Sequence, residues 1–244
     1  MSVLEHCIVP DWPAPKNVRA MQTTRSGGVS VAPYESFNLG EHVGDLQQAV
    51  AQNRQLLASV MPSEPVWLQQ VHGTVVVDAG DTSCLPQADA AATRHRGAVC
   101  VVMTADCLPV LLCDESGTVV AAVHAGWKGL ATGVIESTVK AMAIAPQKLL
   151  VWLGPAISQR AFEVGDDVRE VFVVQQAQAT EAFLPGANGK WMADIYLLAH
   201  QRLHALGITR VYGGEQCTYS DSARFFSYRR DGVTGRMGTF IWLE

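Results

Sequence analysis

The sequence has no long uninterrupted apolar run and no recognisable export signal. No segment approaches the roughly 18 apolar residues that a membrane-spanning helix needs. The first residues, MSVLEHCIVPDWPAPKN, have no basic start, and the prolines at positions 10, 13 and 15 would break a helix. We therefore expect a cytoplasmic protein that has no membrane partner.

Positive charge is also scarce, since 18 Lys and Arg stand against 23 Asp and Glu and the formal net charge is −5. A nucleic-acid-binding face needs clustered basic residues, so we expect no nucleic-acid partner. Neither G-x-G-x-x-G nor G-x-x-x-x-G-K-[ST] occurs, which excludes a Rossmann fingerprint and a P-loop. The hydrophobic content of 48% argues against a disordered chain. These features favour an enzyme that acts on small molecules, and we expect a monomer.

Disulfide spacing is missing as well. The six cysteines, at positions 7, 84, 100, 107, 113 and 217, include no C-x-x-C pair. Without an export signal they are better interpreted as thiols, most of them small buried hydrophobic residues.

Strand-like segments dominate the first half of the chain. Several are apolar and β-branched throughout, which is typical of strands covered on both faces of a sheet. No repeat, low-complexity tract or linker divides the chain, so we expect a single catalytic domain over residues 1–244. The predicted strands are 18–24, 66–70, 75–78, 98–104, 110–113 and 118–124.

Helical segments punctuate these strands and give a mixed α+β chain. Asp194 is a good N-cap and Gly207 a good residue to end the helix between them. Near the end of the chain, 225–229 and 237–243 flank Asp231-Gly-Val-Thr-Gly, which predicts a β-hairpin. The predicted helices are 47–59, 130–143, 168–176 and 195–206.

One cysteine and one histidine are predicted to face each other across two antiparallel strands. Cys107 and His124 flank a turn-like segment, Asp114-Glu-Ser-Gly-Thr118. With a two-residue loop at Glu115-Ser116, the Cβ atoms of Cys107 and His124 would lie directly opposite, about 5 Å apart. A three-residue loop would shift this register by one, and Pro109 must lie where no ladder N–H is needed. In that register both side chains reach one metal ion.

The third ligand is predicted to be His72, in Gln69-Gln-Val-His72-Gly, at the end of an apolar strand. Two imidazoles and one thiolate are a normal zinc set, and three protein ligands leave one coordination position open. An open position indicates a catalytic ion, which activates water or polarises a substrate group. His124 in an apolar strand and Asp106 beside Cys107 support this interpretation, because buried polar groups are costly without a partner or a function. The alternative is a packed cysteine with scattered histidines.

Two further histidines have the spacing of a zinc pair on a helix but lack its other features. His200 and His204 fall on the polar side of the predicted helix 195–206. Gln201 stands where a catalytic glutamate would be needed. We interpret both histidines as part of a solvated face.

Three basic segments place a cation beside flexible backbone. They are Arg25-Ser-Gly-Gly, Trp127-Lys128-Gly and Tyr228-Arg229-Arg230. Such groups can recognise phosphate or carboxylate. Taken alone, ordinary surface charge is the simpler interpretation.

Seven segments, in order along nearly the whole chain, resemble the YfiH/laccase-domain family. This family has been described as polyphenol oxidases and is linked to purine nucleoside metabolism. The chain shows no departure at the metal positions. The segments are Thr23-Thr-Arg-Ser-Gly-Gly-Val-Ser, Ser36-Phe-Asn-Leu-Gly, Gln69-Gln-Val-His72-Gly, Met103-Thr-Ala-Asp-Cys107-Leu-Pro, Ala122-Val-His124-Ala-Gly-Trp-Lys-Gly, Leu153-Gly-Pro-Ala-Ile and Phe226-Ser-Tyr-Arg229-Arg.

The resemblance implies a four-layer α/β/β/α fold with mixed sheets, related to cysteine hydrolase-like toxins. It implies zinc on His72, Cys107 and His124, with these three residues also catalytic. The implied reactions are phosphorolysis of adenosine, inosine, guanosine and methylthioadenosine, together with adenosine deamination. Purine nucleosides and phosphate are then the small-molecule partners.

The resemblance also makes particular residues candidates for substrate binding. Arg25, Lys128 and Arg229 become candidates for binding phosphate. Asn38, Gln70 and Asp106 are expected to line the pocket.

Three other functions stay open at this point. Cys107 could be the nucleophile of a cysteine hydrolase with His124 as its base, for example one that edits peptidoglycan precursors. A copper oxidase is a second alternative, because a Cys-His₂ trio resembles a blue-copper set, although the other five histidines are scattered and include no H-x-H pair. A metal-binding or partner protein without turnover is the third.

Overall fold

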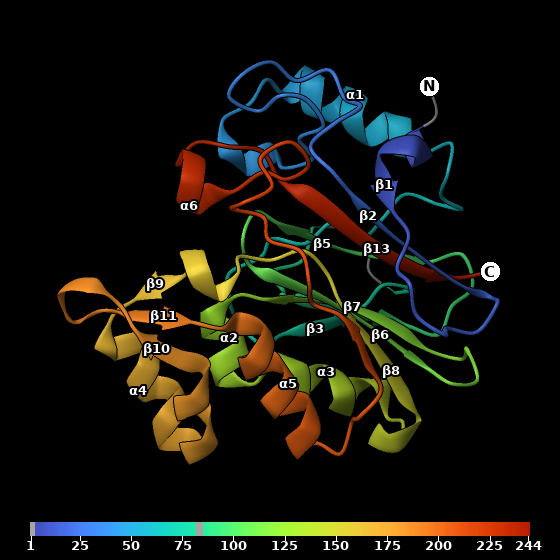
Figure 1. The fold of residues 1–244 in the computed structure, drawn as a ribbon. Helices are drawn as coiled ribbons and strands as arrows, with labels where there is room; N and C mark the ends of the chain where they lie inside the picture. Colours follow the sequence, from blue (N-terminus) through green and yellow to red (C-terminus); the bar gives the residue numbers. More distant parts are fainter. Residues whose placement is uncertain (1–2, 82–84) are drawn as a thin grey trace.

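Two β-sheets lie face to face between layers of helix, as expected for an α/β/β/α fold (Figure 1). The structure is a computed structural model that describes residues 3–81 and 85–244. Of the cysteines considered above, Cys84 lies outside the described residues. No helix in the described part of the chain combines the length and the apolar character needed to cross a bilayer.

The first sheet has four strands, and β13 lies in its interior. β13 pairs antiparallel with both β2 and β5, and all of its residues are buried. Helix α1 covers the outer face of this sheet through a core that includes Leu57 and Phe240 (Figure 1). The elements are β1 (Cys7–Ile8), β2 (Val18–Thr23), β13 (Met237–Leu243), β5 (Val99–Thr104) and α1 (Gln47–Leu57).

The second sheet has six strands and is buried on both faces. Its strands β6, β7 and β8 consist only of buried residues, which explains their unbroken apolar sequences. Leu111 and Ala122 on this sheet pack with Ile241 of the first sheet in the core between the two. In sheet order the strands are β12 (Val211–Gly213), β8 (Leu149–Leu153), β6 (Leu108–Asp114), β7 (Val120–Ala125), β4 (Ala90–Thr93) and β3 (Val76–Asp78).

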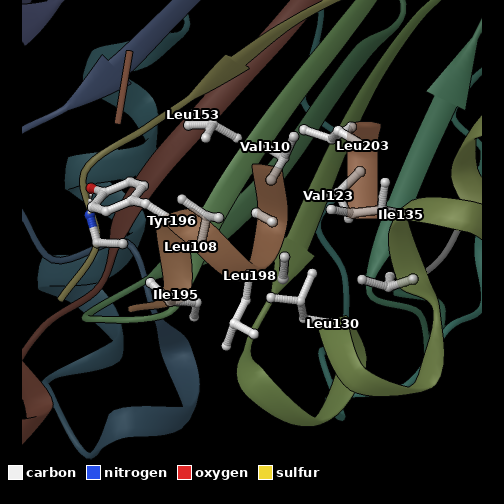
Figure 2. Close-up of a cluster of buried hydrophobic side chains, with 14 of the residues drawn as sticks. Leu108, Val110, Val123, Leu130, Ile135, Leu153, Ile195, Tyr196, Leu198 and Leu203 are labelled. Atoms are coloured by element: carbon white, nitrogen blue, oxygen red, sulfur yellow. Dashed lines mark hydrogen bonds between the residues drawn. The ribbon is translucent and has the colours of Figure 1, made fainter. Parts of the chain in front are cut away.

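Three helices cover the other face of the second sheet. Figure 2 shows their shared core, in which Leu130, Ile135 and Leu198 from the helices meet side chains of β6, β7 and β8. A small three-stranded sheet and α4 lie beside this layer (Figure 1). The elements are α2 (Trp127–Thr132), α3 (Val134–Met142), α5 (Ile195–Ala205), α4 (Asp166–Gln175), β9 (Glu163–Val164), β10 (Phe183–Pro185) and β11 (Trp191–Ala193).

The remaining helical elements are short. They are α6 (Tyr228–Asp231) and the 3-10 helices Val3–His6, Glu41–Val43, Pro146–Lys148, Gln159–Ala161, Ala177–Ala182 and Ala187–Gly189.

Two sequence-based predictions of elements were wrong. Residues 66–70 form only isolated bridges, Val66 with Cys100 and Gln69 with Gln87, so His72 follows a loop. The helix predicted over 130–143 is two helices, because Gly133 has a left-handed backbone with φ of 98°. The helix predicted over 47–59 is confirmed and ends two residues earlier, at Leu57.

The predicted C-terminal hairpin is also absent. Residues 225–229 are not a strand, since Phe225 and Phe226 are buried in a separate core and Ser227 caps the short helix α6. The Ser227 hydroxyl accepts a hydrogen bond from the Arg230 backbone N–H at 3.2 Å. β13 takes its hydrogen-bonding partners from strands much earlier in the chain instead.

The register of β6 against β7 differs by two residues from the one predicted. His124 pairs with Pro109 rather than with Cys107. The Asp114 carboxylate accepts backbone hydrogen bonds from Thr118 at 2.6 Å and Val119 at 3.0 Å, which holds a longer loop than Glu115-Ser116. Pro109 lies where β7 needs no N–H donor from it. Its partner His124 instead forms its backbone hydrogen bond on the other side of β7, where the His124 N–H donates to the Asp89 carbonyl oxygen at 2.7 Å.

Candidate active site

The side chains of His72, Cys107 and His124 converge on one point. Their ligand atoms all lie within 4.8 Å of one another. The Cys107 Sγ atom is 3.8 Å from His72 Nε2, and the two imidazole rings have centroids 4.8 Å apart at 70°. His124 is buried, Cys107 is half-buried and His72 is exposed, so the cluster can be reached from solvent on one side.

The side chains of Cys107 and His124 meet although the predicted register of β6 against β7 was wrong. Side chains alternate between the two faces of a strand, so a shift of one residue would have separated them across the sheet. The shift is two, which leaves Cys107 diagonal to His124 on the same face, within reach of its long side chain. Cys107 itself lies just before β6, after Asp106 has turned the chain with a φ of 102°.

Asp89, which is not among the predicted site residues, connects the two histidines. Its fully buried carboxylate accepts a hydrogen bond from His124 Nδ1 at 2.8 Å. It also accepts backbone hydrogen bonds from His72 at 2.9 Å, Gly73 at 2.6 Å and Val71 at 3.2 Å. One carboxylate therefore fixes the orientation of the His124 ring and holds the loop that presents His72.

The loop at His72 fits closely against the start of α2. His72 has a left-handed backbone with φ of 60°. A Cβ atom at Gly126 would lie 2.7 Å from His72 Cδ2 and 3.0 Å from Cys107 Sγ, and one at Gly129 would lie 3.0 Å from the Gly73 carbonyl oxygen. Gly126, just before α2, and Gly129, within α2, are thus both needed for this close approach.

The charges of the cluster are coupled. Burial raises the pKa of the Cys107 thiol, but the neighbouring His124 and His72 outweigh it and bring the pKa down to about 6. Burial opposes protonation of His124, but Cys107 and Asp89 raise its pKa to about 9. Burial also opposes ionisation of Asp89, yet hydrogen bonds from His124 and the Gly73 backbone keep its pKa below the ordinary value. The favoured state is a thiolate beside a protonated imidazole.

This donor set fits a zinc ion. A thiolate and two imidazoles are ligands that zinc accepts, and the Asp89 contact leaves His124 Nε2 as the ring nitrogen available for a metal. The only other group of candidate ligands among residues 3–81 and 85–244 is Asp78, Asp81 and His95, all three exposed. His200 and His204 are exposed on α5, as predicted.

Two cavities meet at the cluster. The larger one, of about 350 Å³, is lined by Gln70, Thr104 and Arg236 among others. The smaller one, of about 220 Å³, is mostly apolar and aromatic, with Trp127, Phe162 and Ile157 in its wall. Four residues line both cavities: His72, Ala105, Cys107 and Tyr228.

Three of the predicted substrate-binding residues line these cavities. Gln70 lines the larger one and is held by two hydrogen bonds to the Met103 backbone, at 2.7 and 2.8 Å. Asp106 and Arg229 line the smaller one. The Asp106 carboxylate accepts hydrogen bonds from the Thr218 hydroxyl and from the Arg229 backbone N–H, both at 2.7 Å.

The other three lie elsewhere. Asn38 is fully buried, and its amide bonds Gly40, Asp45 and the Arg236 backbone rather than facing either cavity. Arg25 donates to the carbonyl oxygens of Glu35 and Ser222, both at 3.0 Å. Lys128 is exposed at the start of α2, and neither it nor Arg25 is among the residues that line the two cavities.

The sequence contained signals for two residues that were missed. Asp89 precedes the apolar run Ala90-Ala-Ala, so it is a charge beside a strand core, the same signal that drew attention to Asp106. Arg236 stands between Gly235 and Met237, beside glycine in the same way as Arg25. Thr104, Tyr228 and His42 carry no local signal that they line the larger cavity.

Comparison with known proteins agrees with the family resemblance. A family model described as multi-copper polyphenol oxidoreductase laccase matches residues 19–244. A purine nucleoside phosphorylase of Pseudomonas aeruginosa is 56% identical over 238 residues, covering 97% of this chain and 98% of the relative. The purine nucleoside phosphorylase YfiH of Escherichia coli is 54% identical over 239 residues, with 97% and 98% covered.

Solved structures show the same fold. A Neisseria meningitidis protein of the DUF152 family has a TM-score of 0.95 at 49% identity, covering 98% of this chain and 99% of that chain. YlmD of Geobacillus stearothermophilus has a TM-score of 0.86 at 31% identity, covering 95% and 94%. The four-layer arrangement predicted from the resemblance is confirmed.

Proposed function

The chain belongs to the family described as multi-copper polyphenol oxidoreductase laccase, and on that premise we propose that it is a purine nucleoside phosphorylase acting at His72, Cys107 and His124. The observation that carries the proposal is that two cavities meet at this cluster, one walled by aromatic side chains and the other containing Arg236 and Gln70. An aromatic cavity suits a planar base, and a cationic one suits phosphate. Residues 1–244 would act as one catalytic domain.

The proposed reaction displaces the base from the ribose. An oxygen of hydrogen phosphate forms a bond to C1′ while the bond from C1′ to the base nitrogen breaks. The electron pair of the broken bond stays on the base, and the proton of hydrogen phosphate ends on that base. The products are ribose 1-phosphate and the free purine, so atoms and charge balance.

This chain's residues would hold the reactants beside the cluster. Trp127, Phe162 and Tyr228 line the cavity where they would contact the base, and Gln70 is fixed by the Met103 backbone in the wall of the other cavity. Holding two reactants in one orientation lowers the entropic part of the barrier. Burial of His124 and Asp89 keeps water away from one side of the cluster.

His72, Cys107 and His124 would hold zinc, and copper is the other metal that this set could take. Bound there, zinc supplies a Lewis acid that activates water or polarises a substrate group. We further propose that adenosine, inosine, guanosine and methylthioadenosine are substrates for phosphorolysis. Adenosine would also be deaminated, as a water oxygen adds at C6 and the amino nitrogen leaves as ammonia.

The test is to incubate purified protein with adenosine, with and without phosphate, and to separate the products by chromatography. Adenine should appear only when phosphate is present, and inosine in both samples. Cys107→Ala should make neither product while its circular dichroism stays unchanged. Cys7→Ala is the matched control and should keep full turnover, because Cys7 lies on β1 at the edge of the other sheet. Full turnover by Cys107→Ala would disprove the assignment of the site.

A cysteine hydrolase, such as one that edits peptidoglycan precursors, is supported by a separate observation. Cys107, His124 and Asp89 stand in the order nucleophile, base and orienting carboxylate, with His124 Nδ1 held at 2.8 Å. Removing the metal with a chelator distinguishes the two functions. Zinc-dependent turnover should disappear and return when zinc is added, whereas a cysteine hydrolase would keep its activity without metal.

A further inference from the structure

The larger cavity contains an arginine and no carboxylate. Arg236 lines it together with His42 and Gln70, and no Asp or Glu is among the described residues of its wall. The cavity also adjoins Cys107 and His124. Any anion that enters it therefore meets a positive group directly beside the cluster.

The guanidinium group of Arg236 is only partly used by the protein. Its Nη1 atom donates to the backbone carbonyl oxygens of Thr234 at 3.1 Å and Gly235 at 3.0 Å. No carboxylate within residues 3–81 and 85–244 forms an ion pair with it. Burial lowers the pKa of Arg236, although Cys107 and Asp106 oppose that shift. A half-buried cation with unused donors favours an anion from solution.

Thr104 supplies a second and independent observation. It lines the same cavity, its exposed fraction is only 2%, and its hydroxyl has no hydrogen-bond partner among the described residues. Buried hydroxyls in native proteins nearly always have a partner. Thr104 pairs with Met237 across β5 and β13, so Arg236 lies next to it at the same end of the first sheet.

We propose that Arg236 and Thr104 form the phosphate subsite of the enzyme, an inference that rests on the proposed phosphorylase function. The guanidinium group donates to two phosphate oxygens, and a rotation of the Thr104 side chain, whose hydroxyl is buried in the wall of the cavity, lets that hydroxyl donate to a third. Arginine suits this role because its planar donors match two oxygens of one phosphate.

In this subsite Arg236 takes the phosphate-binding role that was predicted for Arg25, Lys128 and Arg229. Arg25 already uses Nε and Nη1 on backbone carbonyl groups, and neither Arg25 nor Lys128 lines a cavity at the cluster. Arg229 lines the smaller, aromatic cavity, and its Nη1 atom donates to the carbonyl oxygen of Glu163 at 3.0 Å. Base and phosphate would thus enter two different cavities that meet at the cluster, where the displacement at C1′ would take place.

Steady-state kinetics on the zinc-loaded protein test this proposal, with phosphate and adenosine varied separately. In Arg236→Gln the KM for phosphate should rise about 10- to 100-fold, the loss expected for charged hydrogen bonds, while the KM for adenosine stays within about twofold. In Arg236→Lys the KM for phosphate should lie between the values of the wild type and of Arg236→Gln. Arg96→Gln is the matched control, because Arg96 is exposed in the loop after β4 and should leave both constants unchanged.

Thr104→Val keeps the proposal testable if Arg236→Gln fails to fold. It removes a hydroxyl without a partner, so stability should be kept or gained, while the KM for phosphate rises about 3- to 10-fold. Calorimetry with inorganic phosphate adds a measurement that needs no turnover: wild-type protein should bind phosphate, and Arg236→Gln should not.

The outcomes separate the two proposals. If wild-type protein binds phosphate through Arg236 but releases no base, the phosphorylase function is wrong and the anion subsite stands. If wild-type protein releases base and both Arg236→Gln and Thr104→Val keep the wild-type KM for phosphate, the subsite is wrong. A rise in that KM in Lys128→Gln or Arg25→Gln, with none in Arg236→Gln, would move the subsite to those cations.

Discussion

At the scale of single residues, Asp89 determines how two side chains of the cluster are presented. It is fully buried, and its carboxylate has four hydrogen-bond donors from the protein, including His124 Nδ1 at 2.8 Å and the Gly73 N–H at 2.6 Å. Partners of this kind fix the tautomer and the ring orientation of a metal-binding histidine. A buried carboxylate with all its lone pairs engaged is also an anchor for the loop 71–73.

We predict that Asp89→Asn weakens zinc binding about 10- to 100-fold, as loss of such a partner does in other metal sites. An amide nitrogen cannot accept the hydrogen bonds that one carboxylate oxygen receives, so the His72 loop loosens as well. Competition with a chromogenic chelator measures the affinity. Asp167→Asn, at an exposed carboxylate in the first turn of α4, is the control and should bind zinc as wild type does. Unchanged affinity in Asp89→Asn would contradict the assigned role.

The lowered pKa of Cys107 predicts how its reactivity depends on pH in metal-free protein. Because the pKa is about 6, the thiol is ionised above that pH, and the rate of alkylation by iodoacetamide should rise with a midpoint near it. Cys7 is an internal control, since burial raises its pKa to about 11 and it should stay unreactive in this range. Mass spectrometry of the labelled peptides distinguishes the two. A Cys107 midpoint at or above pH 8 would show that the histidines do not stabilise the thiolate.

At the scale of elements, the connection from β7 to α2 positions the cluster. His124 lies in β7, Gly126 is the N-cap of α2, and α2 begins at Trp127, whose side chain lines the smaller cavity. The segment must therefore turn close to His72 and Cys107 within a few residues. Gly126 has an ordinary φ of −62°, so space rather than backbone conformation requires glycine there.

We predict that Gly126→Ala disrupts the cluster more than it destabilises the fold. The new methyl group would lie 2.7 Å from His72 Cδ2, so the His72 ring must move and zinc binding and turnover should fall at least tenfold. Gly97→Ala is the contrasting control. A Cβ atom at Gly97 would meet no other atom within 4 Å, but the residue has a φ of 79°. The substitution should therefore lower the free energy of unfolding by about 1 kcal/mol through backbone strain and leave turnover unchanged. Urea denaturation and zinc titration of both variants measure the contrast, and equal effects on zinc binding would contradict it.

At the scale of the whole molecule, the site lies where the ends of the two sheets meet. The first sheet contributes Thr104 from β5 and Arg236 just before β13, and the second contributes His124 from β7 and Cys107 just before β6. The relative position of these groups depends on the core between the sheets, in which Leu111 and Ile241 are fully buried. Packing between the sheets therefore supports the site as well as the fold.

We predict that Leu111→Ala lowers the free energy of unfolding by about 2–5 kcal/mol, the cost of removing a fully buried leucine side chain. Val174→Ala, on a side chain that is 86% exposed, is the control and should change it by less than about 0.5 kcal/mol. Urea denaturation followed by circular dichroism gives both values. A change below about 1 kcal/mol for Leu111→Ala would mean that the two sheets do not pack tightly at this position.

Local sequence determined the elements whose stability is local. The unbroken apolar runs around Val101, Leu111 and Val123 predicted buried strands, because such runs lie between two packed layers. Asp194 was identified as an N-cap, and its carboxylate accepts a hydrogen bond from the Leu197 N–H at 3.0 Å. The exposed positions of His200 and His204 followed from helical periodicity alone.

Only the tertiary structure decided which residues form the site. Cys107 and His124 were paired in the wrong register, because the Asp114 carboxylate at the end of β6 accepts backbone hydrogen bonds from Thr118 and Val119 and so holds a longer loop. Asp89 meets the His72 loop, and Arg236 meets Thr104, across separations along the chain that no local pattern records. Alternation and periodicity report which face of an element is buried, but not which distant element will cover it. That choice is made when the two sheets and their helices pack together.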